Sequence, residues 1–418
     1  MLHAWGGAGA AKKREKPHRR FRLRGFPELP TSETLAGLVI QSFPTYVSDQ
    51  HHREYTGEWR LSPHDLGSQC DTEPMRAAIY HRFGGPISVE ELPDPEVPAD
   101  GVVVRVGASG LCRSDFHGWD GHDRSIRLPH VPGHELAGTI EGIGPEVAGF
   151  RVGDRVTVPF AVGCGRCEQC TSGNPQICDD DFQPGFTAWG SFAELLAIPR
   201  ADLNLVPLPP LMELSSAALL GCRFATAYRA IAQRGAVRPG HWVAVHGCGG
   251  LGLSAVMIAV ALGARVVAVD IREQALARAR DLGAELTVDG ASSEDPAAVI
   301  REVTHGGAHL SLDSLGSPAT ATNSILSLRK QGRHVQVGLL SGGPTPLPMD
   351  AVIARELEIL GSHGLAAGDY AELLALVESG RVDPGLLVDR EISLDQVPEE
   401  LIALRNFSGD GVAVVTRF

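Results

Sequence analysis

The sequence has little positive charge and no long hydrophobic run. Its 418 residues contain 37 lysines and arginines against 50 aspartates and glutamates, which gives a formal net charge of −13. We therefore expect no binding to nucleic acid or to anionic membranes, because both require a basic face. The longest apolar stretch, residues 255–264, is about half the length that a membrane-spanning helix needs. Hydrophobic residues still make up 43% of the chain, enough for a globular core.

Lysine is scarce, and its distribution separates the first 74 residues from the rest. Only four lysines occur, and three of them lie within the first sixteen positions. Residues 1–24 carry eight basic side chains against one acidic side chain, and a stretch rich in Pro, Ser and His follows without a sustained hydrophobic period. We expect residues 1–74 to be a disordered N-terminal extension or sequence upstream of a start at Met75, with an organelle transit peptide as a further alternative.

Cysteine is also sparse, since eight in a chain of this length are too few for a disulfide scaffold. Four of them are concentrated in one short segment: Cys164, Cys167, Cys170 and Cys178. Four thiolates at this spacing can bind one Zn²⁺ in a closed, structural site. Two disulfides or four free thiols are the alternatives. An iron–sulfur cluster is disfavoured, because Asp179 stands where a proline usually follows the last cysteine.

Hydrophobic patterning predicts two kinds of structure after residue 74. Short β-branched runs separated by Gly, Pro and Asp predict a β-rich unit with strands at 75–80, 87–91, 102–106, 138–143 and 155–158. From about residue 210, strands expected at 242–245, 265–269, 286–288, 310–313, 334–337 and 357–360 alternate with helices expected at 251–262, 272–282, 296–303 and 319–330. This alternation predicts an α/β fold with a doubly wound parallel sheet. The tail, 361–418, is expected to hold one helix at 370–378 and a strand at 411–416.

A glycine-rich motif joins the first strand and the first helix of this parallel sheet. It consists of Gly247, Cys248, Gly249, Gly250, Leu251 and Gly252. Glycines at these positions allow a tight turn and a close approach of the backbone to a pyrophosphate at the helix N-terminus. Asp270 ends the next strand, where a carboxylate can accept hydrogen bonds from ribose hydroxyls and repel a 2′-phosphate. Arg272 has the opposite effect on a 2′-phosphate. We expect NAD to bind here, and a glycine-rich turn without a cofactor is the alternative.

A third group of candidate residues is dispersed along the chain and comprises Cys112, His134 and Cys222. Two cysteines and one histidine provide three protein ligands and leave an open position, which is what a catalytic zinc requires. Taken singly, such a cysteine is more often part of a core and such a histidine more often lies at the surface. Only their joint context therefore favours a metal site.

From Met75 to Phe418 the chain resembles the zinc-dependent alcohol dehydrogenases of the medium-chain dehydrogenase/reductase superfamily. Residues 133–147 fit the zinc signature of that family, and the four closely spaced cysteines fit its structural lobe. The resemblance implies a GroES-like catalytic domain at 75–223, a Rossmann domain at 224–361 and a return to the catalytic domain at 362–418. It also implies two zinc ions per chain, NAD, and a small-molecule alcohol or aldehyde as substrate.

The resemblance implies roles for the residues around the metal. Cys112, His134 and Cys222 match the catalytic zinc ligands. Glu135 matches a carboxylate that can coordinate the metal transiently, and Asp115 matches the group that hydrogen-bonds the zinc-bound histidine.

Further roles concern the substrate and the cofactor. Ser114 matches the hydroxyl that receives the proton of the alcohol, and His117 matches the outlet of this relay towards solvent. Arg113 matches a contact to the pyrophosphate, and Phe160 matches an aromatic wall of the substrate pocket. A second pyrophosphate arginine, which some relatives place near the position of Ala413, has no counterpart here, so a somewhat weaker grip on the cofactor is expected.

We therefore expect a cytoplasmic enzyme that reversibly oxidises a small or medium alcohol. Phe116 and Phe160 favour an apolar alcohol over a sugar polyol. Polyol, threonine and formaldehyde-type zinc dehydrogenases remain alternatives, and a non-enzymatic zinc-binding module is a remote one. A zinc-free quinone reductase is disfavoured, because it would lack Cys112 and His134. The short interval between Cys178 and Cys222 is similar to that of tetrameric microbial members, so we expect a homo-oligomer, with a tetramer favoured over a dimer.

Overall fold

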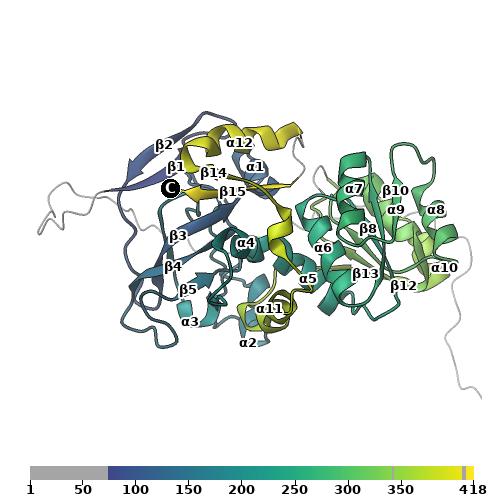
Figure 1. The fold of residues 1–418 in the computed structure, drawn as a ribbon, viewed down its shortest axis with the longest axis horizontal. Coiled ribbons are helices and arrows are strands. Elements are labelled where there is room, and N and C mark those ends of the chain that lie inside the picture. The colour runs from purple at the N-terminus through teal and green to yellow at the C-terminus, as the bar shows by residue number, and fades with distance from the viewer. Residues whose placement is uncertain (1–73, 341–342, 407–410) are drawn as a thin grey trace, which may run out of the picture. The chain divides into compact units, whose positions relative to one another are not determined.

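The computed structural model describes residues 74–340, 343–406 and 411–418. The extension predicted at 1–74 lies outside the described residues except for Pro74, so it stays a prediction. Among the described helices, none is long and apolar enough to span a membrane. The described chain divides into a β-rich region and an α/β region, each with its own sheet (Figure 1).

The β-rich region combines strands from both ends of the described chain. These strands are β1 (Met75–Tyr80), β2 (Ile87–Leu92), β3 (Val102–Gly110), β4 (Leu136–Ile143), β5 (Arg155–Thr157), β6 (Leu195–Ile198), β7 (Val206–Pro207), β14 (Val388–Ser393) and β15 (Val412–Arg417). A seven-stranded sheet has the order β14-β15-β3-β4-β5-β7, with β6 also paired to β3, while β1 and β2 form a separate hairpin. The helices of this region are α1 (Arg113–Trp119), α2 (Glu168–Thr171), α3 (Ala201–Asn204), α4 (Leu214–Ala218), α11 (Tyr370–Glu378) and α12 (Val397–Ala403).

The central strand β3 shows why this sheet forms. Val102, Val104 and Val106 alternate along it and are buried in the core, whereas Arg105 between them is exposed and pairs with Glu141 of the neighbouring β4. The strand is covered on both faces near its start, because Val103 packs into a second hydrophobic cluster, and only Arg105 is exposed.

The α/β region is a six-stranded parallel sheet. Its strands are β8 (Trp242–His246), β9 (Arg265–Asp270), β10 (Leu286–Asp289), β11 (Ala308–Asp313), β12 (Leu328–Gln336) and β13 (Glu358–Gly361), in the order β10-β9-β8-β11-β12-β13. Its helices are α6 (Gly250–Ala261), α7 (Glu273–Asp281), α8 (Pro296–Val303), α9 (Pro318–Leu326) and α10 (Met349–Arg355). The strand order reverses between β8 and β11, and ligands of such sheets bind at the carboxyl ends of the strands at this switch point. The predicted fold class, α/β with a doubly wound parallel sheet, is confirmed.

Two predicted segments differ from the structure. The helix expected at 319–330 ends at Leu326, and β12 begins at Leu328, which is fully buried and pairs with Ala308 of β11. Pairing with the sheet here overrides a helical pattern. The tail also holds a second helix, α12, and the parallel strand β14, neither of which was predicted. β14 contains the charged run Asp389-Arg390-Glu391 and has no continuous apolar pattern.

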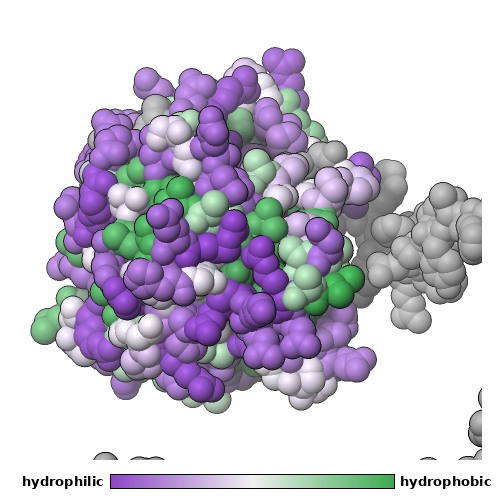
Figure 2. Space-filling model, turned by 90° about the vertical axis from the view of Figure 1, so that its right-hand side faces the viewer, coloured by the Kyte–Doolittle hydropathy of each residue, from purple (hydrophilic) through white to green (hydrophobic). Residues whose placement is uncertain are grey.

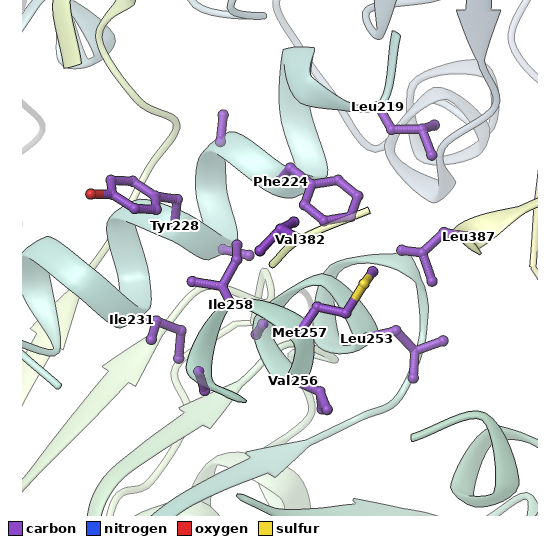
Figure 3. Close-up of a cluster of buried hydrophobic side chains, with 14 of the residues drawn as sticks. Leu219, Phe224, Tyr228, Ile231, Leu253, Val256, Met257, Ile258, Val382 and Leu387 are labelled. Carbon is purple, nitrogen blue, oxygen red and sulfur yellow. The ribbon is translucent and has the colours of Figure 1, made fainter. Parts of the chain in front are cut away.

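Eight short helical segments complete the described chain. They are η1 (Pro175–Ile177), η2 (Leu220–Phe224), α5 (Ala225–Tyr228), η3 (Arg229–Arg234), η4 (Ala367–Asp369), η5 (Pro384–Leu387), η6 (Leu394–Gln396) and η7 (Leu404–Asn406), of which η2 and η3 are π-helices and the other η segments 3₁₀ turns. Of these, η2, α5 and η3 lead from the β-rich region into the parallel sheet. Figure 3 shows side chains from η2 and α5, among them Phe224, packed against Met257 and Ile258 of α6. Burial of each large side chain contributes roughly 1.5–3 kcal/mol. The segment from η2 to α5 is therefore firmly attached to α6.

Candidate active site and cofactor crevice

Four potential metal ligands meet in one cluster, which we call the open cluster: Cys112, His134, Glu135 and Cys222. Their ligand atoms all lie within 4.8 Å of one another. Cys112 directly precedes α1, His134 and Glu135 directly precede β4, and Cys222 lies in the π-helical turn η2. Single π-helical turns within helices often mark functional sites. The chain thus brings together residues that are 110 positions apart.

Asp115 organises the open cluster. Its Oδ1 accepts hydrogen bonds from His134 Nδ1 at 2.7 Å and from the backbone N–H of Gly133 at 3.1 Å, and its Oδ2 accepts one from the backbone N–H of Cys112 at 3.0 Å. Because Nδ1 is occupied, His134 presents Nε2 to the cluster. That nitrogen is buried and has no hydrogen-bond partner among the described residues.

The donor set fits a zinc ion. An unpartnered imidazole nitrogen between two cysteine sulfurs is a costly arrangement unless a cation binds there. A hydrogen bond from the Cys222 thiol holds the pKa of Cys112 well below its ordinary range, which favours the thiolate that a metal requires.

Glu135 is held by an arginine that sequence analysis did not single out. Arg223 Nε donates to both carboxylate oxygens of Glu135, at 3.0 and 2.8 Å, and Nη2 lies 2.6 Å from Oε2. Burial raises the pKa of Glu135 to about 7, and the positive charge of Arg223 opposes this rise. One feature of the sequence could have revealed this pair. Arg223 directly follows the predicted ligand Cys222, and a basic side chain next to a buried ligand needs a buried acidic partner.

The closed cluster of four cysteines lies in the lobe formed by residues 164–178. The sulfurs of Cys164 and Cys170 are 3.9 Å apart, and those of Cys167 and Cys178 are 3.7 Å apart. Disulfide sulfurs would lie near ~2.05 Å. Four sulfurs arranged tetrahedrally around zinc at ~2.3 Å lie roughly 3.8 Å from one another. The geometry thus fits zinc and does not fit disulfides.

Backbone N–H groups support this closed cluster. The N–H groups of Arg166 and Cys167 donate to the sulfur of Cys164 at 3.5 and 3.3 Å, and that of Cys170 donates to Cys167 at 3.4 Å. These bonds, foremost that from Arg166, lower the pKa of Cys164 to about 6. The loop therefore stabilises the thiolate of Cys164 before any metal binds, whereas burial raises the pKa of Cys170 and of Cys178.

Helix α1 carries the predicted proton path. Ser114 lies in its first turn, and His117 Nε2 accepts a hydrogen bond from Arg113 Nε at 3.3 Å. His117 Nδ1 lies 3.0 Å from Nδ1 of His122, which sequence analysis missed. Burial, followed by the charge of Arg113, lowers the pKa of His117. His117 is thus favoured in its neutral form and is connected towards the exposed side by His122.

Aromatic side chains border the open cluster. The rings of Phe160 and Phe186 lie 6.1 and 5.1 Å from the ring of His134, and His363 lies 4.9 Å from Phe160. Only Phe160 among these was predicted, because Phe186 and His363 come from segments without a local motif.

The glycine-rich motif has the geometry that its sequence predicts. Gly247 adopts a φ of +89°, and a Cβ on Gly252 would lie 1.8 Å from the carbonyl oxygen of Gly247. Only glycine fits at either place. A Cβ on Gly249 would meet nothing within 4 Å, so the backbone there faces open space. Leu251 occupies the first turn of α6 and packs against the core.

Asp270 lies beside this motif. It accepts hydrogen bonds from the backbone N–H groups of Cys248 at 2.7 Å and Arg272 at 3.0 Å, and the Arg272 side chain lies 3.5 Å away. A crevice runs between the motif and the C-terminal part of the chain, and its lining includes Gly249, Gly250, Arg272, Leu387 and Val412. Burial raises the pKa of Cys248, which makes this thiol a packing residue. The glycines, the acid and the crevice fit a dinucleotide.

Comparisons with known proteins agree with this geometry. A family profile described as "Zinc-binding dehydrogenase" matches residues 250–379, and one described as "Alcohol dehydrogenase GroES-like domain" matches residues 98–210. An alcohol dehydrogenase of Geobacillus stearothermophilus is 36% identical over 311 residues, 74% of this chain and 90% of the relative. An NAD-dependent alcohol dehydrogenase of Sulfurisphaera tokodaii is 34% identical over 354 residues, 82% of this chain and 99% of the relative. The crystal structure of benzyl alcohol dehydrogenase from Acinetobacter calcoaceticus superposes with a TM-score of 0.76 at 28% identity, covering 83% of this chain and 100% of that one.

Proposed function

Because the chain belongs to the zinc-dependent alcohol dehydrogenase family of oxidoreductases, with zinc and NAD as cofactors, we propose that it reversibly oxidises small or medium-sized apolar alcohols. The main support is the open cluster, in which the buried Nε2 of His134 faces two cysteine sulfurs beneath the rings of Phe160 and Phe186. An aromatic wall of this kind offers apolar contact and no hydrogen bonds to extra hydroxyls. It therefore favours an apolar alcohol over a polyol.

We assign the residues near the substrate as follows. Cys112, His134 and Cys222 would hold the catalytic zinc, with Glu135 beside it, and the four lobe cysteines would hold a second, structural zinc. When bound, zinc supplies Lewis-acid polarisation of the substrate oxygen, and NAD accepts the hydride. Asp115 fixes the tautomer of His134 and the position of its ring.

The proton path uses groups of α1. Ser114 receives the hydroxyl proton of the alcohol and passes it towards His117, whose neutral form can accept it. His122, hydrogen-bonded to His117, leads the proton towards solvent.

Cofactor binding is assigned to the glycine-rich motif, Arg113, Asp270 and Arg272. The carboxylate of Asp270 has lone pairs left for ribose hydroxyls after it accepts the two backbone N–H bonds. A 2′-phosphate would bring roughly two negative charges against that carboxylate. The side-chain nitrogen of Arg272, 3.5 Å from Asp270, is already engaged by this acid. This arrangement supports a preference for NAD over NADP.

The assay of the proposed function is cofactor reduction with a panel of alcohols. We expect the highest kcat/KM with NAD and apolar primary or aromatic alcohols such as benzyl alcohol. Polyols, threonine and a formaldehyde–thiol adduct represent the alternative members of the family. A maximum with any of these three, or with NADP as cofactor, would contradict the assignment.

We further propose a cytoplasmic homo-oligomer, with a tetramer favoured over a dimer. In support, β13 is an edge strand of the parallel sheet, and the neighbouring Met349 and Ile353 of α10 are 51% and 76% exposed. Figure 2 shows hydrophobic residues among the hydrophilic ones on the face of the molecule turned towards the viewer. We also propose domain boundaries at 223/224 and 361/362, and the span of the parallel strands from Trp242 to Gly361 supports them. Native mass spectrometry measures the assembly.

A further inference from the structure

We propose that Arg223 donates hydrogen bonds to the pyrophosphate of the cofactor from one edge of its guanidinium, while the other edge holds Glu135 beside the catalytic metal. This inference rests on the proposed function, because it takes the glycine-rich crevice to be the NAD site. One side chain would then link the metal centre and the cofactor loop.

The first observation concerns what Arg223 already binds. Its Nε and Nη2 are used by the carboxylate of Glu135, and Nη2 also donates to the carbonyl oxygen of Leu111 at 2.8 Å. The residue is 5% exposed, and in the described part of the chain Nη1 forms no hydrogen bond. A buried guanidinium with one nitrogen left over has donors to spare for another acceptor.

The second observation concerns where Nη1 lies. A Cβ on Gly250 would be 2.3 Å from Nη1 and 3.2 Å from the central carbon of the guanidinium. Gly250 is the first residue of α6, so the guanidinium packs directly against the start of that helix. A side chain at this glycine would push the arginine away.

Placing a cation at a helix N-terminus is electrostatically unfavourable. The N–H groups of the first turn give this end of α6 a partial positive charge, which repels a guanidinium and attracts anions. Glu135 neutralises Arg223 on its other side, but it does not lie in the glycine-rich loop. An anion bound at Gly249 and Gly250 would be attracted by both the helix and Arg223, and the open space beside Gly249 leaves room for one.

The rest of the crevice offers few other cations. Where the C-terminal strand borders it, the lining residues are Gly411 and Val412, and Ala413 follows. Arg223, which packs against Gly250 of the crevice lining, therefore supplies the positive charge that was expected to be missing near Ala413. Its position is also fixed, because Phe224 and Leu219 on either side of it pack into the cluster formed with α6 (Figure 3).

The test measures ligand affinity of the zinc-loaded protein by calorimetry. ADP-ribose contains the pyrophosphate but not the nicotinamide, and adenosine lacks phosphate, so the pair isolates the phosphate contact. In Arg223→Met we expect the dissociation constant of ADP-ribose to rise by about 10- to 100-fold, the usual value of a hydrogen bond to a charged group. The affinity for adenosine should change by less than about twofold.

A second variant guards against unfolding, because Arg223→Met leaves Glu135 buried without its partner. The double variant Glu135→Gln/Arg223→Met leaves neither charge unpaired, and it should show the same selective loss of ADP-ribose binding with zinc content retained. Arg229→Met, which removes a neighbouring arginine bound to Gln233, is the matched control.

The outcomes separate the inference from the function on which it rests. Selective loss of ADP-ribose affinity in both variants supports the phosphate contact. Equal affinities in the wild type and the variants, or parallel losses for ADP-ribose and adenosine, show that Arg223 is only a structural partner of Glu135. If the wild type itself does not bind ADP-ribose, the NAD assignment fails and this inference fails with it.

Discussion

The closed cluster and the open cluster use the same kind of ligand but are built in opposite ways. The closed cluster draws all four sulfurs from residues 164–178 and is supported by backbone N–H groups of the same loop. The open cluster draws its ligands from three separate segments and is supported by the side chains of Asp115 and Arg223. A local loop can form its site largely by itself, whereas the open cluster exists only once the whole domain has folded.

This difference predicts different consequences of losing a ligand. The closed cluster has four protein ligands and no position for a substrate, so its zinc can only stabilise the lobe. The open cluster lies in a region that is already held by a large hydrophobic core on both sides, so its zinc serves the reaction more than the fold.

Cys112→Ser should have the largest effect on activity. Loss of one of three ligands weakens the catalytic zinc, which supplies several kcal/mol of stabilisation, so kcat/KM should fall about a thousandfold or more. The melting temperature should stay within about 1 °C of the wild type, since the surrounding core is unchanged. Steady-state kinetics, thermal unfolding and zinc analysis check this, and zinc should drop from about two to about one per chain. Retained turnover would show that the catalytic metal is held elsewhere.

Cys167→Ser should act on stability instead. The lobe has little core of its own, so loss of its zinc should cost about 2–3 kcal/mol and lower the melting temperature by roughly 3–4 °C, because a chain of about 340 residues has an unfolding entropy of ~0.7 kcal/mol/K. Activity measured well below that temperature should stay within a few-fold of the wild type. Equal changes in melting temperature for Cys112→Ser and Cys167→Ser would abolish the distinction between the two clusters.

The same difference explains how far the sequence could predict each site. The closed cluster was evident from spacing alone, because all four ligands lie in one loop. The open cluster was recognised only through the family resemblance, since nothing local links Cys112 to Cys222. Arg223 was missed because its partners, Glu135 and Gly250, come close only through the π-helical turn and its packing on α6. Phe186 and His363 were missed for the same reason.

The fold shows a similar division. Strands with continuous apolar runs, such as β8 and β9, and helices with a clear period, such as α8, lie within one or two residues of their predicted bounds. The missed or misassigned strands are segments whose structure is set by partners in the sheet. β14 contains charged residues and pairs with β15. The start of β12 has a helical sequence pattern but pairs with β11. Local pattern could not reveal those partners.

Asp115→Asn sharpens the comparison, because only the open cluster depends on a side chain to orient a ligand. An amide in place of the carboxylate keeps the shape but weakens its hold on His134 Nδ1. We expect zinc affinity of the open cluster and kcat to fall by about 10- to 100-fold, while the closed cluster keeps its metal. Competition with a chelator measures both sites in one experiment. Simultaneous loss of both metals would mean that the two clusters are coupled.

A pH profile gives the smallest effect. It tests the connection of the open cluster to solvent through the paired histidines His117 and His122. Burial, then Arg113, then His122 lower the pKa of His117 below 6.5, so the neutral form that can accept a proton persists to more acidic pH. For alcohol oxidation, kcat/KM should therefore fall only as the pH drops through this lowered pKa, and should be level above it. His122→Asn removes one of the groups that lower the pKa of His117 and also the next member of the proton path, so the acidic limb should move to higher pH and the plateau should fall. His305→Asn is the control, because His305 is exposed and its φ of +55° suits asparagine. An unmoved limb in His122→Asn would show that His117 does not set the acidic limb, and the proton path along α1 would have to be assigned to other groups.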